Sequence, residues 1–146
     1  MEEIIKEKTS ADHLLYVSLK YTKTCDVILN LIARWKSMIE LSFDKILDKG
    51  VEDKKIPNKP KSPKERIEFI KKYFKKSLPI QDILPLYVFF KRIPELNKTR
   101  EGEFRKNVTL KIMDVGKTVE INMDLLMEYS KKVDEFITEI RKLLAD

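Results

Sequence analysis

Few side chains of this 146-residue chain are of the types that carry acid–base or metal chemistry. His13 is the only histidine and Cys25 the only cysteine, and neither stands among other ligand-type residues at close spacing. Metal sites combine several histidine, cysteine or carboxylate ligands, and di-iron bundles use a Glu-x-x-His pair that this sequence lacks. We therefore expect no catalytic residue, no metal site and no cofactor. The alternative is an acid or base role for His13 beside Asp12.

The sequence also lacks the glycine-rich motifs of nucleotide-dependent enzymes. It holds three glycines, and it contains no P-loop, dinucleotide fingerprint or Gly-x-Ser-x-Gly elbow. Phosphate cradles need glycine where the backbone approaches the ligand closely, so these enzyme classes are excluded.

Three carboxylates, Glu40, Asp44 and Asp48, are spaced four residues apart. On a helix they would share one face, which we call the acidic ledge. Like charges at this spacing repel one another, so a solvated face is the expectation. A cation or a basic partner bound to the acidic ledge is the alternative.

Positive charge gathers in the segment 54–76, which we call the basic window. It holds ten basic residues against Glu65 and Glu68, a charge of +8, whereas the whole chain carries +6. Phosphates would neutralise such a segment and release counterions. The candidate polyanion-binding residues are seven cations and two aromatic residues that could stack on bases: Lys61, Lys64, Arg66, Lys71, Lys72, Lys75, Lys76, Phe69 and Tyr73.

Other interpretations of the basic window remain open. One is that the lysines serve solubility alone, with Phe69 and Tyr73 at the edge of the core. Another is that the partner is an acidic protein or a membrane surface. Arginine reads base edges better than lysine, and Arg66 is the only arginine of the window. Any nucleic-acid binding should therefore be largely independent of base sequence.

The elements that position these residues follow from apolar spacing. Residues 11–49 contain no glycine or proline, and their apolar residues recur at steps of three and four. The pattern predicts a helix of roughly 55 Å, begun by a capping box at Thr9–Asp12 and ended by Gly50, or two helices with a tight joint. So long a helix needs partners along its length, and a homodimer through this helix or through a hairpin edge is expected.

The rest of the chain predicts shorter elements. A basic, proline-containing loop is expected over 51–62, and then a helix over 63–77 that begins at Ser62 and closes at Pro79. Asp82 is expected to cap a helix that ends near Arg92, with a buried strand as the alternative. Residues 95–106 should form a loop.

Alternating apolar residues predict a β-hairpin over 107–121, with a four-residue turn at 114–117. Asn122 should cap a final helix whose inward stripe is Leu126, Tyr129, Val133, Phe136, Ile140 and Leu143. The sum is one mainly α domain over residues 1–146. It is an antiparallel bundle of about four helices with a long first helix and one hairpin before the last helix.

Composition suggests a source and a location. Charged residues make up 37% of the chain, rich in lysine and glutamate, which is typical of archaeal and other thermophilic proteins. Codon bias in an AT-rich microbe is the alternative. Met1 to Ile5 do not resemble a signal peptide, and the apolar run 84–90 is too short to span a membrane, so a soluble cytoplasmic protein is expected.

The segments Asp12–Val17 and Lys20–Thr24 on the first helix resemble those of small archaeal helical-bundle proteins, and the layout of roughly two thirds of the chain resembles HEPN-type bundles. HEPN nucleases carry an arginine followed shortly by a histidine, and no histidine follows His13. The resemblance therefore implies dimerisation and partner binding but not RNase activity.

The expected function is that of a non-catalytic binding or adaptor protein that contacts nucleic acid or an acidic partner. The alternatives are a HEPN-like partner subunit of a nucleotidyltransferase or toxin–antitoxin system, and a structural interaction protein.

Overall fold

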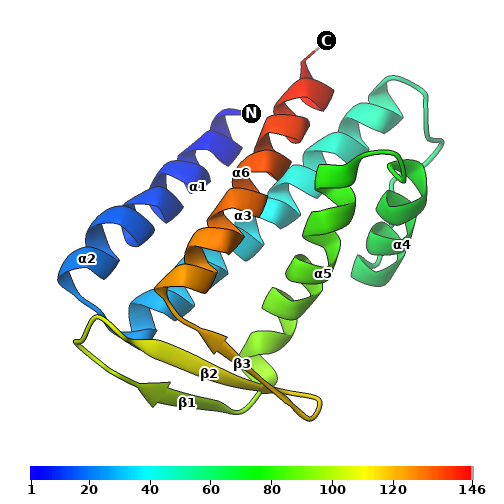
Figure 1. Ribbon diagram of the computed structural model, residues 1–146. Helices are drawn as coiled ribbons and strands as arrows, with labels where there is room; N and C mark the ends of the chain where they lie inside the picture. Colours follow the sequence, from blue (N-terminus) through cyan, green and yellow to red (C-terminus); the bar gives the residue numbers. More distant parts are fainter. Residues whose placement is uncertain (146) are drawn as a thin grey trace.

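The stretch predicted as one long helix is two helices that fold back on each other. In the computed structural model, which describes residues 1–145, the chain leaves the helical conformation at Thr22 and resumes it at Cys25. Thr24 has an extended backbone, and its hydroxyl accepts a hydrogen bond from Val27 N at 3.4 Å. The helices before and after this joint lie side by side (Figure 1): α1 (Glu2–His13), a π-helical turn (Leu14–Ser18), α2 (Leu19–Tyr21) and α3 (Cys25–Glu52).

The π-helical turn decides which residues of the first segment are buried. Ala11, Leu15 and Leu19 are buried, whereas Val17 and Tyr21, two of the apolar residues whose spacing predicts the long helix, are 40% and 77% exposed. A π turn is wider than an α turn, so residues four apart stay on one side of it. The capping box at Thr9 was also wrong, because α1 begins at Glu2 and the Thr9 hydroxyl donates to Ile5 O at 3.0 Å inside that helix.

α3 ends three residues later than predicted, and Gly50 is not its stop. Lys54 adopts the left-handed conformation with φ 61°. Its N–H donates to Val51 O at 3.0 Å and Lys55 N donates to Gly50 O at 2.9 Å. These are the two hydrogen bonds of a Schellman motif. Lys54 therefore occupies the left-handed position after the helix end, where glycine is the usual residue.

Of the next two helices, the first is shorter than predicted and the second is longer. The start of α4 (Pro63–Tyr73) at Ser62 is confirmed, since the Ser62 hydroxyl accepts from Glu65 N at 3.1 Å. α4 stops at Tyr73, because Ser77 already caps α5 (Leu78–Arg92) through Ile80 N. The predicted cap at Asp82 and the strand alternative were wrong. Pro79 begins this helix instead of closing the one before, since proline suits a first helical turn.

The sheet has three antiparallel strands, not a lone hairpin. β2 (Thr109–Asp114) and β3 (Lys117–Ile121) confirm the hairpin, and β1 (Lys98–Glu101) pairs with the other edge of β2. β1 lies within residues 95–106, which were predicted to form a loop. The prediction missed this strand because its residues are polar and show no apolar alternation. The turn has two residues rather than four: Asp114 pairs with Lys117, and Val115 and Gly116 both have positive φ.

The last helix closes an aromatic core. Asn122 caps α6 (Met123–Leu144) as predicted, accepting from Leu125 N at 2.9 Å. Trp35 of α3 stacks on Phe90 of α5 with centroids 6.1 Å apart, and Tyr129 of α6 meets Phe90 edge-on at 5.5 Å. These rings join three helices through a buried cluster, where each aromatic pair adds stability beyond its buried area.

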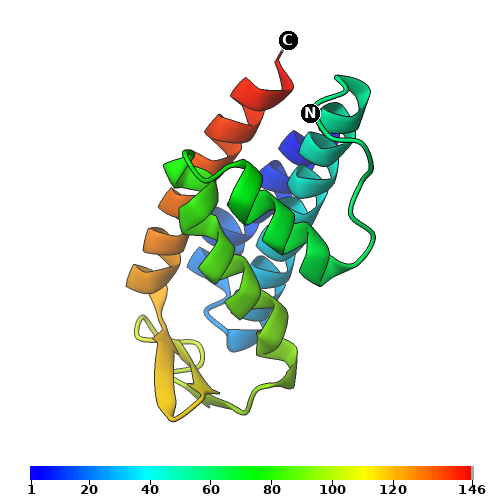
Figure 2. The same cartoon turned by 90° about the vertical axis from the view of Figure 1, so that its right-hand side faces the viewer.

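The predicted mainly helical class is confirmed, whereas the count of about four helices and the lone hairpin match only roughly. The sheet lies across one end of the helices, and the N-terminus and the end of α6 lie at the other end (Figures 1 and 2). Within the described residues, no helix is long and apolar enough to cross a membrane.

Candidate nucleic-acid interface

α4 and the turn after it carry most of the candidate residues. Ser62 and Pro63 start the helix beside the proline-containing loop, and Gln81 of α5 closes its other end. The Gln81 amide donates to Phe74 O at 3.0 Å and to Lys71 O at 3.3 Å. The only glutamine of the chain thus satisfies carbonyls that the end of α4 would leave unpaired, and it fixes the turn to α5.

Two cations of the basic window are neutralised by the acidic ledge of α3. Arg66 donates to Asp44 at 2.8 Å, and Lys59 lies 2.8 Å from both Asp44 and Asp48. Arg66 also donates from Nε to Pro60 O at 3.0 Å. Burial raises the pKa of Asp44, but the ion pairs with Lys59 and Arg66 more than offset this and hold it below its usual value. Arg66, a candidate residue, therefore serves to hold α4 on α3.

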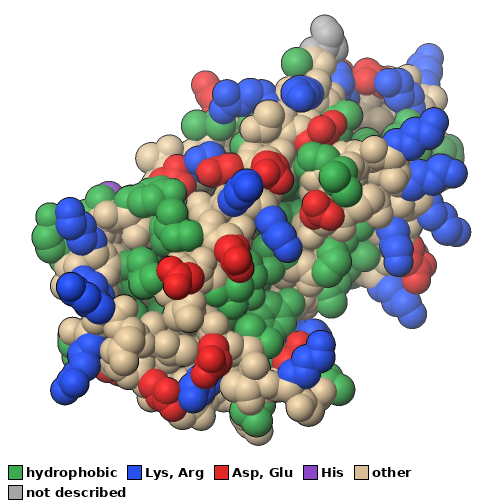
Figure 3. All heavy atoms as spheres, in the orientation of Figure 1, with side chains coloured by type: hydrophobic (Ala, Val, Ile, Leu, Met, Phe, Trp, Pro, Cys, Tyr) green, Lys and Arg blue, Asp and Glu red, His purple; other side chains and the backbone are tan. Residues whose placement is uncertain are grey.

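The other eight lysines of the basic window have no ion-pair partner within residues 1–145, and all eight are exposed. They are Lys54, Lys55, Lys61, Lys64, Lys71, Lys72, Lys75 and Lys76, which we call the free lysines. Figure 3 shows lysine and arginine side chains gathered at the right-hand edge of the molecule, where Figure 1 has α4 and the loop before it. The charge segregation of the sequence is thus a surface feature.

The structure places the end of the basic window differently from the sequence prediction. Lys75 and Lys76 do not continue the helix face of Lys71, because α4 ends at Tyr73 and these two residues lie in the turn before α5. Lys55, which was not among the candidates, lies in the Schellman turn that ends α3. Its position in the charged loop gave no signal of that location.

The two aromatic candidates stack on each other. The rings of Phe69 and Tyr73 are nearly parallel, at 15°, with centroids 5.4 Å apart. Phe69 is half-buried, whereas Tyr73 is 43% exposed and meets Phe74 edge-on at 4.9 Å. The alternative that Phe69 and Tyr73 both lie at the edge of the core thus fits Phe69 alone. Tyr73 is partly exposed to solvent among lysines.

A cavity of about 250 Å³ lies between α3, α4 and α5, and Tyr87 and Glu40 both line it. Tyr87 donates its hydroxyl to Glu40 at 2.8 Å, and Lys36 lies 3.6 Å from the same carboxylate. Burial, and after it the hydrogen bond to Glu40, raises the pKa of Tyr87. The phenol therefore stays protonated as a donor and is unsuited to act as a base.

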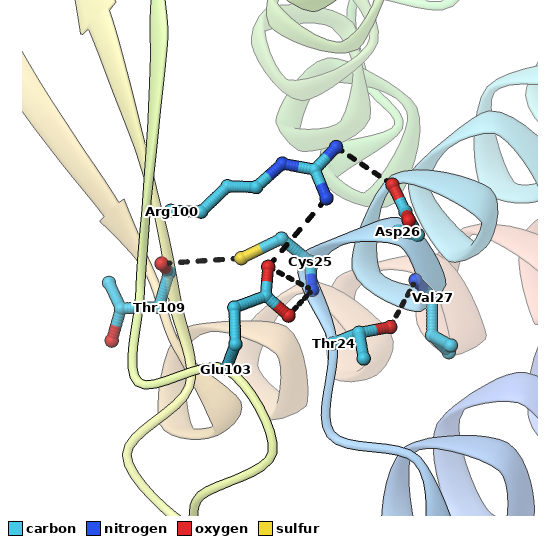
Figure 4. Close-up of polar contacts among 7 residues, drawn as sticks. All are labelled: Thr24, Cys25, Asp26, Val27, Arg100, Glu103 and Thr109. Atoms are coloured by element: carbon cyan, nitrogen blue, oxygen red, sulfur yellow. Dashed lines mark hydrogen bonds and ion pairs between the residues drawn. The ribbon is translucent and has the colours of Figure 1, made fainter.

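A second polar cluster surrounds Cys25 at the start of α3 (Figure 4). Glu103 accepts from Cys25 N at 3.3 Å, Arg100 lies 3.6 Å from Glu103, and Arg100 also donates to Asp26 at 2.7 Å. The thiol donates to Thr109 O at 3.4 Å. Burial, and after it the Glu103 carboxylate, raises the pKa of Cys25 from 9.0 to about 11. A thiol in this state is a packing residue and not a nucleophile.

His13 is exposed and borders a hollow that it shares with Thr9, Ser10 and Arg34. Arg34 is paired with Glu7 at 3.2 Å. Within residues 1–145, no group of three or more histidine, cysteine and carboxylate residues is arranged to hold a metal ion. The free lysines and Tyr73 are exposed together on α4 and around it, and they form the candidate binding surface.

Comparison of the chain with protein-family models, with curated proteins and with solved structures found no match. The resemblance to HEPN-type bundles therefore stays a prediction, and the case for a function rests on the geometry of this surface.

Proposed function

We propose that the protein is a non-catalytic nucleic-acid-binding protein that uses the free lysines. The proposal rests on one observation, which is that the free lysines have no carboxylate partner in the part of the chain that the structure describes. The acidic ledge of α3 neutralises Lys59 and Arg66, and eight lysines nearby keep no carboxylate partner within the described residues. Crowded like charges repel one another, and phosphates would relieve that repulsion while counterions are released.

The lysines favour contact with a phosphate backbone over base reading. Lysine is a flexible point charge, whereas arginine forms the bidentate contacts that identify a base. Arg66 is already held by Asp44 and by Pro60 O. Binding should therefore be salt-dependent and tolerant of sequence. An acidic protein would meet the same charges, but the exposed Tyr73 ring among them favours a ligand with stacking bases.

The test is fluorescence anisotropy of labelled RNA and DNA oligomers, titrated with protein at several salt concentrations. We expect log affinity to fall linearly with log salt, at about −0.7 per neutralised phosphate for a single strand. Four charge reversals, Lys71→Glu, Lys72→Glu, Lys75→Glu and Lys76→Glu, should abolish binding at physiological salt.

A matched control reverses four exposed lysines outside the basic window, Lys6, Lys106, Lys117 and Lys132. This variant has the same net charge as the first, so it should bind more weakly than the wild type but far more tightly than the quadruple variant of the basic window. Equal loss in both variants would show only a dependence on net charge. No binding of any oligomer at low salt would point to an acidic protein partner instead.

A homodimer was expected through the long helix or through a hairpin edge, and the fold removes the reason for the first of these. From Cys25 onward the apolar stripe of residues 11–49 is buried within a single chain, because α1 folds onto α3. A dimer through the outer edge of β1 or β3, each of which pairs only with β2 among the described strands, stays a proposal. Light scattering at about 100 µM tests it, and a monomer would exclude it at that concentration.

A HEPN-like partner role and a cytoplasmic location also stay proposals. Co-purification with a nucleotidyltransferase encoded beside the protein would support the first, and fractionation of source cells would test the second.

A further inference from the structure

We infer that the ligand is a single-stranded nucleic acid, one base of which stacks on Tyr73 while the adjoining phosphate binds beside Lys75 and Lys76. This inference rests on the proposed function. It is carried by two neighbouring hollows that share Tyr73 and Phe74 as a common wall. Each hollow has two lysines and one carboxylate in its lining, but only the first adds the apolar side chains of Ile46 and Leu143 to the shared rings. The first hollow therefore suits a base, and the second suits a phosphate.

The first hollow, of about 160 Å³, suits a base. Ile46 of α3, Phe74 and Leu143 of α6 supply apolar walls, and Tyr73 also borders it. Its volume is below the roughly 300–1,000 Å³ of sites that enclose a drug-sized ligand, so it accepts one ring system and leaves the sugar outside. A base on Tyr73 would extend the stack that Phe69 and Tyr73 already form.

Charged residues stand at the rim of this first hollow. Lys55 lies there, with its backbone N–H held by Gly50 O at 2.9 Å. Asp53 is also present, and Lys49 lies 3.5 Å from its carboxylate. Asp53 is thus paired with Lys49, and Lys55 can meet a phosphate at this rim.

The second hollow, of about 360 Å³, suits a phosphate. Lys75, Lys76 and Ser77 line it at the start of α5, where a helix carries partial positive charge. Glu139 of α6 borders the same space, and its charge opposes an anion. Two lysines and the helix start outweigh this single carboxylate.

The geometry selects single strands over duplexes. A base in a duplex is covered on both faces by its neighbours, so it cannot lie against Tyr73 without being unstacked. In a single strand the same face is available at little cost, and each base stacked on an aromatic ring adds affinity whatever its identity.

The test compares three labelled probes of equal length: a single-stranded oligothymidylate, an abasic oligomer with the same phosphates, and a duplex. We expect the protein to bind the oligothymidylate about tenfold or more tightly than the abasic oligomer, the effect of one stacked base. Tyr73→Leu should remove this preference and leave the affinity for the abasic oligomer unchanged. Tyr73→Phe should keep the preference, because the ring is retained.

Tyr21→Leu is the matched control, since Tyr21 is 77% exposed on another part of the surface and also follows a lysine, Lys20. It should leave the preference intact. Equal binding of base-bearing and abasic oligomers, or a preference that survives Tyr73→Leu, would overturn this inference while the proposed function stands. Absence of salt-dependent binding to all three probes would overturn both.

Discussion

Arg66 of α4 donates from Nη1 to Oδ1 of Asp44 on α3 at 2.8 Å, so the basic window and the acidic ledge meet in space. Lys59 contacts the same carboxylate at the same distance. In the sequence Asp44 lies 15 residues before Lys59 and 22 residues before Arg66. Their pairing holds α4, through Arg66, and the loop before it, through Lys59, against α3. The remaining lysines of the basic window are exposed.

Replacing Asp44 should destabilise the protein at neutral pH but not in acid. Because the pKa of Asp44 is lowered in the folded state, its contribution is present above its unfolded pKa and is lost as pH falls through the folded pKa. The side chain is 39% exposed, so Asp44→Asn should lower the free energy of unfolding by only about 0.5–1 kcal/mol at pH 7. Urea unfolding at pH 7 and at about pH 2.5 measures this.

Asp82→Asn is the control for this change, because Asp82 is exposed and has no ion pair within the described residues. It should leave stability unchanged at both pH values. A deficit of Asp44→Asn that persisted in acid would show that the loss arises from packing and not from the ion pairs.

One substitution in the hairpin turn should raise the stability of the protein. Val115 has φ 45° and is 85% exposed, so a β-branched side chain occupies a left-handed position without compensating contacts. Asparagine tolerates this conformation, and Asn-Gly is a preferred pair for two-residue turns. Val115→Asn should raise the free energy of unfolding by about 1 kcal/mol, measured by urea titration. Val115→Ala, which lacks this tolerance, should gain less.

Local signals predicted two of the helix starts that depend on a single capping side chain, but they missed the start of α5 at Ser77. Ser62 and Asn122 both accept the hydrogen bonds expected of N-caps. Thr24 also caps a helix, but no acidic residue follows at the third position of α3, and its neighbours continue the apolar spacing. The break at residues 22–24 was therefore open to either interpretation from the sequence.

Elements that depend on tertiary contacts were not predictable. β1 is held by its pairing with β2, and its own residues carry no strand pattern. For the candidate site, the sequence indicated where the lysines lie but not which are neutralised. That division depends on the packing of α4 on α3, which sets Arg66 and Lys59 against the acidic ledge.

Glu103 should matter to the stability of α3 although it lies in the loop before β2. Its carboxylate accepts from Cys25 N at the first turn of the helix, where negative charge is favourable. Glu103→Ala should lower the free energy of unfolding by about 1 kcal/mol, as for the loss of a helix cap. Hydrogen exchange at the Cys25 amide should quicken in the same variant. Glu101→Ala, in the same segment but paired with Lys111, is the control that leaves this amide protected.

Cys25 should make the folded protein less stable at alkaline pH. Burial, and after it Glu103, raises the pKa of the thiol from 9.0 to about 11, so above pH 9.0 the unfolded chain releases this proton before the folded chain does. The protonated thiol therefore gives its full stabilising effect below the pKa that Cys25 has in the unfolded chain. This effect is lost as pH rises through the pKa that Cys25 has in the folded protein. Between pH 7.5 and 10.5, the wild type should lose about 2 kcal/mol relative to Cys25→Ala, which lacks the titration.

Urea unfolding of both proteins at the two pH values measures this difference, and subtraction removes the contribution of every other group that titrates in the same range. The thiol should also resist a disulfide reagent at pH 8 until the protein is unfolded, because its side chain is fully buried. A constant difference between wild type and Cys25→Ala across this range would mean that the thiol ionises equally in both states, and rapid labelling of the native protein would mean that the start of α3 opens readily. Either result would contradict the role of Glu103 and the sheet in closing the joint between α2 and α3.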